Sequence, residues 1–200
     1  MRKLSKGEPH EAISDFEGHA NWSLSSDYHS IWRELILDVE QCSLSGYTEE
    51  TIKLDNSHID HFYKRSLFPK EVHSWDNFIV DSLDDTYGAR YKDKLVKNTD
   101  DNIKLINPVT EDPHVFFKYK VDGRIAPLDL LSEKDKDRAD FTISAFNLNE
   151  ASLVERRRVL FKNVDDYGDA SLEQLLDWLK ESGFPSVIEQ IYNERMDYDD

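Results

Sequence analysis

The sequence predicts an α+β fold, mostly helical, formed by a single domain. The chain has 200 residues, 38% of them hydrophobic and 12% aromatic, which is enough apolar material to bury one core. Residues 28–41 carry apolar side chains at helical spacing, whereas residues 51–62 form short β-like runs around a turn. Because no repeat and no Gly/Ser/Pro linker divides the chain, we expect one continuous unit.

The N-terminal part is expected to be helical. Trp32, Leu35, Ile36 and Val39 follow the spacing i, i+3, i+4 and i+7, which places them on one helix face. The sequence thus predicts a helical segment over residues 1–41 that delivers the chain to Cys42.

The middle of the chain predicts a small hairpin followed by a helix. Residues 51–54 and 58–62 are β-like and flank Asp-Asn-Ser at 55–57, a typical turn composition. The polar and basic stretch 84–96 predicts a helix with Gly88 near its start.

In the second half, two prolines in residues 106–113 indicate a loop, and Asp122-Gly123 between apolar residues predicts a hairpin. Helices are expected at about 135–146 and 149–161.

The last predicted helix begins at Ser171, which has capping-box spacing to Gln174 and precedes a leucine stripe. Gly183 is expected to end it, and the tail 195–200 to fray.

Charge and cysteine content restrict the function. With 41 acidic and 25 basic residues the net charge is −16, the wrong sign for long-range attraction of a polyanion. Residues 62–104 are an exception, with eight basic and eight acidic residues. The single cysteine, Cys42, excludes an intramolecular disulfide and a four-cysteine zinc site. We expect a cytoplasmic protein without membrane association, because no apolar run approaches membrane-spanning length.

The most informative motif is His58-Ile59-Asp60-His61, followed sixteen residues later by Asn77. This pattern resembles the HNH nucleases, which have a ββα-metal core. The resemblance implies that His61 is the general base, since a neutral imidazole suits proton transfer at cellular pH. It also implies that Asp60 binds Mg²⁺ or Mn²⁺ and that Asn77 orients the loop and the imidazole.

The third metal ligand departs from the family pattern. The resemblance places it on the helix, about nine residues after Asn77, where this chain has Thr86. Threonine is a poor ligand, so we expect Asp85 to coordinate the metal, with Asp84 as the nearest alternative. His58 shares a strand face with Asp60 and is either an extra ligand or a packed strand residue.

A narrower resemblance is to the nuclease subunit of Septu-type antiphage systems (PtuB-like), and it covers roughly residues 1–165. The matching features are Met1-Arg2-Lys3, the Trp32 helix, Cys42-Ser43-Leu44-Ser45, Asp60-His61, Trp75-Asp76-Asn77 and Ser82-Leu83-Asp84-Asp85. Three of the family's four zinc positions are changed, to Ser45, Ser82 and Asp85, so no structural zinc is expected. Cys42 then becomes a small buried hydrophobe.

These features divide the expected unit into residues 1–41, an HNH nuclease core at 42–104, and a C-terminal hairpin with helices at 105–200. Three basic residues of the predicted core helix could contact phosphate or could form a solvated face: Arg90, Lys92 and Lys94. The run at 156–158 has the same two interpretations, and the leucine stripe is either core or a docking face.

The leading hypothesis is therefore a metal-dependent HNH endonuclease subunit that hydrolyses DNA or RNA, possibly transfer RNA, in a prokaryotic antiviral complex. The resemblance implies a PtuA-like ATPase partner and, in some systems, a retron reverse transcriptase with its RNA or DNA. The alternative is a catalytically inactive HNH-fold scaffold or regulatory subunit, which Thr86 and the lost zinc positions favour. An acidic nucleic-acid mimic rests on the charge of −16 alone.

Overall fold

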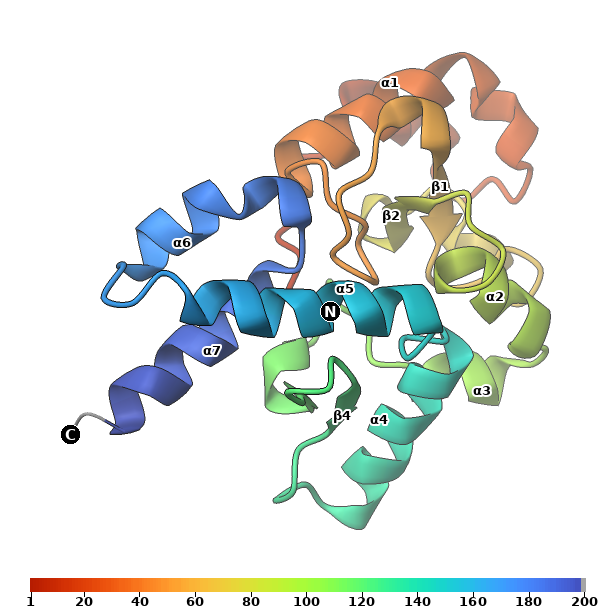
Figure 1. The fold of residues 1–200 in the computed structure, drawn as a ribbon. Helices are drawn as coiled ribbons and strands as arrows, with labels where there is room; N and C mark the ends of the chain where they lie inside the picture. The colour runs from red at the N-terminus through yellow and green to blue at the C-terminus, as the bar shows by residue number, and fades with distance from the viewer. Residues whose placement is uncertain (199–200) are drawn as a thin grey trace.

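The computed structural model describes residues 1–198 and has an α+β fold in which two small antiparallel sheets lie among helices (Figure 1). Strands β1 (Ser57–His61) and β2 (Phe78–Ser82) form the first sheet, and β3 (Phe117–Tyr119) and β4 (Ile125–Pro127) form the second. No described helix is both long and apolar enough to span a bilayer.

The N-terminal part is helical, as predicted, but irregular. It contains the 3₁₀ helices η1 (Glu11–Phe16) and η2 (Trp22–Tyr28), then α1 (His29–Glu34), which continues into the π-helical turn η3 (Leu35–Glu40). Trp32 and Ile36 of this stretch are fully buried, whereas Val39 is 70% exposed. The predicted stripe therefore rotates out of the core where the helix widens into its π turn.

The strand pairing of the first sheet differs from the prediction. Residues 51–54 form no strand, although Thr51 makes one isolated bridge with Leu44. The partner of β1 is β2, with Asp60 opposite Ile79 and His61 opposite Phe78. Val80, Ile79 and Phe78 are fully buried, so this strand offers the larger apolar surface for pairing.

Helix α2 (Gly88–Leu95) follows β2 and packs against it, which gives the element order β1, β2, α2. The helix begins at Gly88 with φ +70, and a Cβ there would lie 2.3 Å from an Asp81 carboxylate oxygen. Asp81 accepts a hydrogen bond from the Ala89 amide at 2.7 Å. Only glycine allows this buried carboxylate to approach the first turn of the helix so closely.

The rest of the chain contains the predicted hairpin and the three predicted helices, together with two helices that were not predicted, at residues 99–104 and 185–198. The helices are α3 (Thr99–Lys104), α4 (Glu133–Ala145), α5 (Ala151–Asp165), α6 (Leu172–Trp178) and α7 (Pro185–Tyr198). The short 3₁₀ helices are η4 (Leu54–Asn56), η5 (Pro69–Glu71), η6 (Trp75–Asn77), η7 (Pro113–Val115) and η8 (Lys180–Ser182). The capping box of Ser171 and Gln174 is confirmed, as is the turn at Gly123 between β3 and β4.

The expectation of a frayed tail was wrong for residues 195–198, which belong to α7, while Asp199 and Asp200 lie outside the described residues. The leucine stripe of α6 belongs in part to the core, because Leu175 and Leu179 are buried. Arg156 pairs with Glu50 at 2.8 Å. The buried guanidinium of Arg157 donates hydrogen bonds to the backbone carbonyls of Gly123 and Leu148. The leucine stripe and the basic run at 156–158 therefore both have structural roles in the folded chain.

Two buried apolar clusters hold the chain together. The larger contains residues from Met1 to Ile191, and the smaller surrounds Trp32 with Trp75 and Phe78. In Figure 1, α5 crosses the view between the β1–β2 sheet above and β4 with α4 below. The β1–β2 sheet thus lies between α1 and α2, which both contact it.

Candidate active site around Asp60, His61 and Asn77

The loop between the two strands is held by a buried amide. Asn77 accepts a hydrogen bond from the Tyr63 amide at 2.6 Å, and its Nδ2 donates to the carbonyls of Tyr63 at 3.1 Å and Glu71 at 2.8 Å. Its side chain lies at the base of residues 62–77 and is almost fully buried. Because three of its bonds fix backbone groups of this loop, Asn77 sets the position of the residues that follow His61.

His61 is held in one orientation at the end of β1. Its Nε2–H donates to the Val72 carbonyl at 2.9 Å, which leaves Nδ1 as the nitrogen with a free lone pair. The ring packs edge-on against Trp22 and Phe78, with centroid distances of 4.6 and 5.1 Å. Burial lowers the pKa of His61 to about 4, so the imidazole is neutral at physiological pH.

Asp60 points to the opposite side of the strand, into the interior. Its Oδ2 accepts hydrogen bonds from the Lys92 ammonium at 2.6 Å and from the Tyr47 hydroxyl at 2.5 Å. Lys92 also donates to the His61 carbonyl at 3.1 Å. Burial acts to raise the pKa of Asp60, but the charge and hydrogen bond of Lys92 outweigh it and keep this pKa below its usual value.

The described side chains do not fit the divalent metal ion that the HNH resemblance implies. One oxygen of the Asp60 carboxylate, Oδ2, is bound by the buried ammonium group of Lys92. Among residues 1–198 no group of three or more His, Cys, Asp or Glu side chains is arranged to hold a metal. A hard divalent cation needs several converging oxygen ligands, and Lys92 instead supplies a positive charge at this carboxylate.

The three candidates for the third ligand have other partners. Asp85 is exposed and lies 3.8 Å from Arg90 and 3.6 Å from Lys94. Asp84 accepts hydrogen bonds from the Thr86 amide at 2.6 Å and the Thr86 hydroxyl at 2.5 Å, which closes a local turn before α2. None of these residues is placed at Asp60 by a described contact.

The three predicted phosphate-binding residues of α2 do not lie together. Lys92 is fully buried and ion-paired with Asp60, so the expectation that it contacts nucleic acid is wrong for this conformation. Arg90 and Lys94 lie nearer the surface, each close to Asp85. The helical repeat explains the difference, because Lys92 lies on the face of α2 turned toward β1.

Of the four positions that the resemblance assigns to zinc, Ser45 and Ser82 are buried, whereas Cys42 and Asp85 are exposed. Cys42 is exposed, contrary to the expectation of a buried hydrophobe. Ser45 is buried, and its hydroxyl donates to the Asp81 carboxylate. Burial raises the pKa of Asp81 to about 7. The sequence analysis missed Asp81 and Tyr47, since neither lies at a motif position and only the fold brings them to the site.

A cavity of about 370 Å³ lies at the end of β1, and the free face of the candidate site opens into it. Its lining residues are His58, Ile59, Asp60, His61, Lys64, Arg65, Ser66 and Asp93. Lys64 and Arg65 place positive charge within the cavity that also contains His61. Their position three and four residues after His61 in the sequence was a signal that the motif did not include.

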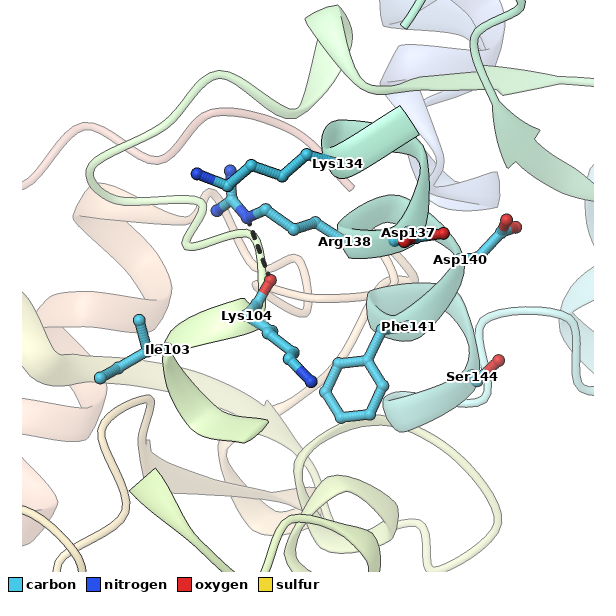
Figure 2. Close-up of a pocket in the computed structure, with 8 residues that line it drawn as sticks. All are labelled: Ile103, Lys104, Lys134, Asp137, Arg138, Asp140, Phe141 and Ser144. Atoms are coloured by element: carbon cyan, nitrogen blue, oxygen red, sulfur yellow. Dashed lines mark hydrogen bonds between the residues drawn. The ribbon is translucent and has the colours of Figure 1, made fainter. Parts of the chain in front are cut away.

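A larger pocket of about 980 Å³ lies elsewhere, between α3 and α4 (Figure 2). Lys104, Lys134 and Arg138 share it with Asp137 and Asp140, and Arg138 donates to the Lys104 carbonyl at 3.2 Å. Side chains of both charge signs line this pocket. It therefore offers no convergent set of groups comparable to those around His61.

No protein-family model matches this chain, and a search of curated proteins finds no significant match.

Proposed function

We propose that this chain is an endonuclease-like subunit that cleaves phosphodiester bonds in DNA or RNA, with His61 as its general base. The observation that supports this proposal is the fixed orientation of His61, whose Nδ1 lone pair is free while Nε2–H is bonded to Val72. A neutral, oriented imidazole beside cationic side chains is a suitable arrangement for proton transfer near a phosphate.

In the proposed reaction, a water molecule loses a proton to Nδ1 of His61 as its oxygen attacks phosphorus. The bond between phosphorus and the leaving oxygen of the strand then breaks, and that oxygen takes a proton from solvent. Lys64 and Arg65 line the same cavity and are positioned to offset negative charge on the phosphate oxygens. Asn77 acts as a positioning residue through the loop that carries Val72, the partner of His61. No step is assigned to a divalent ion, because the described ligands do not fit one.

The setting of this activity comes from the sequence resemblance alone. It comprises a cytoplasmic antiviral defence complex with a PtuA-like ATPase, in some systems together with a retron reverse transcriptase and its RNA or DNA. The net charge of −16 fits a subunit that meets nucleic acid beside a more basic partner.

A second candidate function is a catalytically inactive subunit with a structural or regulatory role in the same complex. The Asp60–Lys92 ion pair favours it, because this pair places an ammonium group where the resemblance implies a metal ligand with a free oxygen. The two candidates share a fold and differ in whether His61 performs chemistry.

The deciding experiment is cleavage of labelled DNA and RNA by the full chain together with its ATPase partner, with Mg²⁺ and with EDTA. We expect His61→Ala and His61→Asn to lower the rate by about 100-fold or more, the usual contribution of a general base. His19→Ala is the matched control, since its side chain is exposed. Melting curves of each variant check that the fold persists.

Absence of cleavage by the wild-type complex on both substrates would contradict the nuclease proposal and favour the inactive subunit. Full activity of both His61 variants would remove His61 from its role as base.

A further inference from the structure

A second pocket adjoins the cavity of the candidate active site. It has a volume of about 420 Å³ and is lined by Trp22, Ser26, His29, Ser30, Arg33, His58 and Ile59. His58 and Ile59 also line the His61 cavity, so the two hollows share a wall formed by β1. The two pockets therefore adjoin at β1, and we call them together the groove.

Two arginines along this groove have no carboxylate partner among residues 1–198. Arg33 donates one hydrogen bond, from Nη1 to the Ser57 carbonyl at 3.0 Å, and its Nε has no partner there. The Arg65 guanidinium lies over the Trp22 ring at 5.9 Å from its centroid. Five other arginines pair with nearby carboxylates: Arg90, Arg124, Arg138, Arg156 and Arg158.

The acidic groups at the groove are already compensated. Asp60 is paired with Lys92 at 2.6 Å. Asp93 lies 3.8 Å from Lys64 and 3.7 Å from Lys92. The two arginines therefore leave an excess of positive charge in this groove, although the whole chain has a net charge of −16.

We propose that the half of this groove lined by Arg33 is a second phosphate-binding subsite, which holds a phosphate of the substrate strand next to the one being cleaved in the half lined by Arg65 and His61. The inference rests on the proposed function, since it takes the phosphate in the His61 cavity as the scissile one. Guanidinium groups match phosphate oxygens with paired hydrogen bonds. Nε of Arg33 is buried, so the donors proposed to bind phosphate are Nη2 of Arg33 and the Arg65 guanidinium, which have no hydrogen-bond acceptor among residues 1–198. Arg65 lines the His61 cavity and Arg33 the adjoining pocket, so the strand passes from one to the other.

This subsite makes the substrate an oligonucleotide rather than a small phosphodiester. A strand with two consecutive phosphates contacts both halves of the groove, and its binding depends on salt because each phosphate contact releases counterions. Trp22 supports the subsite by packing between Arg65 and His29, whose ring stacks on it at 3.8 Å.

The test is binding of a labelled single-stranded oligonucleotide by the full chain carrying His61→Ala, so that binding is measured without cleavage. We expect Arg33→Gln and Arg65→Gln each to weaken binding about tenfold. The slope of log K against log salt should become shallower by about 0.7 for each lost phosphate contact. Lys134→Gln, which removes the same charge from α4, is the matched control and should leave binding unchanged.

Arg65→Gln and Arg33→Lys guard against an effect on folding, because Arg65 makes no hydrogen bond with residues 1–198 and Arg33→Lys retains the charge. Equal binding by wild type, Arg33→Gln and Lys134→Gln would overturn the subsite, as would a complete lack of oligonucleotide binding. Such results would leave the proposed function standing if the wild-type complex still cleaves nucleic acid in a His61-dependent manner.

Discussion

At the scale of single residues, Lys92 determines the electrostatics of the candidate site. Its ammonium group is fully buried and contacts both the Asp60 carboxylate and the His61 carbonyl. A buried ion pair is sensitive to the loss of one partner, because the remaining charge loses its compensation. The folded chain therefore supplies its own positive charge at the Asp60 carboxylate, through the Lys92 ammonium group.

We predict that Lys92→Asn strengthens divalent-cation binding at the Asp60 carboxylate relative to the wild type. The substitution removes the ammonium and places an amide oxygen near the Asp60 carboxylate, and both are hard ligands. Mn²⁺ should then raise the melting temperature of Lys92→Asn and leave that of the wild type unchanged. Electron paramagnetic resonance of bound Mn²⁺ provides a direct second measurement.

Lys94→Asn is the control, because Lys94 is exposed near Asp85 and should remain without effect on Mn²⁺ binding. Adding Asp60→Asn to Lys92→Asn should abolish the strengthened binding. Stoichiometric, Asp60-dependent Mn²⁺ binding by the wild type would show that Lys92 yields its position to a metal.

Residue types also show what the sequence could and could not predict at the site. The motif predicted that His61 and Asn77 lie at the two ends of one loop, and the structure places them there. The inward direction of Lys92 was not predictable, since a lysine in a polar helix is usually exposed and only packing of α2 on β1 turns it inward. Tyr47 reaches Asp60 from a segment without regular structure, and no local pattern announces that contact.

At the scale of elements, the start of α2 depends on the buried Asp81 carboxylate. Asp81 accepts hydrogen bonds from Ser45 and the Ala89 amide, and its pKa of about 7 reflects burial together with the nearby charges of Asp60 and Glu50. The folded chain thus holds a proton on Asp81 over a pH range in which the unfolded chain, with a pKa near 3.8, has released it. Stability contributed by this group decreases as pH rises from about 4 to about 7.

We predict that Asp81→Asn gains stability relative to the wild type as the pH rises from about 5 to about 8. The neutral amide can accept from Ala89 and donate to Ser45, and it avoids ionisation in the interior. Between about pH 4 and about pH 7, the difference in the free energy of unfolding between variant and wild type should change by on the order of 1 kcal/mol per pH unit. Urea unfolding of both proteins across this pH range measures the difference, with Asp84→Asn as a control at the exposed turn.

If the difference between Asp81→Asn and wild type does not change with pH, the pKa of Asp81 is not raised in the folded chain.

Elements with local signals were predicted well, and those that depend on distant contacts were not. Ser171 with Gln174 and the Asp122-Gly123 turn are recognisable within four residues, and both occur as expected. The partner of β1 lies beyond a sixteen-residue loop, so the nearer run at 51–54 was chosen wrongly. Strand pairing across such a loop depends on buried apolar surface, here Phe78 to Val80, which a local pattern does not reveal.

At the scale of the whole molecule, Glu49 joins segments that are far apart in the sequence. Its buried carboxylate accepts hydrogen bonds from the Tyr119 hydroxyl at 3.0 Å and the Ser186 amide at 2.9 Å, and it pairs with the amino group of Met1 at 2.6 Å. Its backbone carbonyl also accepts from the Phe184 amide at 2.8 Å. One side chain thereby connects the segment after η3 with β3 and with the start of α7.

We predict that Glu49→Ala lowers the stability of the whole chain by about 3–5 kcal/mol, as expected when one partner of a buried charge pair is lost. The melting temperature should fall while unfolding stays a single transition, because the larger core includes residues from both ends of the chain. Tryptophan fluorescence reports mainly on Trp22, Trp32 and Trp75, whereas far-ultraviolet circular dichroism reports on all the helices. Coincident curves from the two signals are the expected result.

Glu155→Ala, which removes an exposed pair with Arg158, should change stability by less than about 1 kcal/mol. Two separate transitions in Glu49→Ala would mean that the N-terminal and C-terminal parts are held together by this contact and fold independently without it.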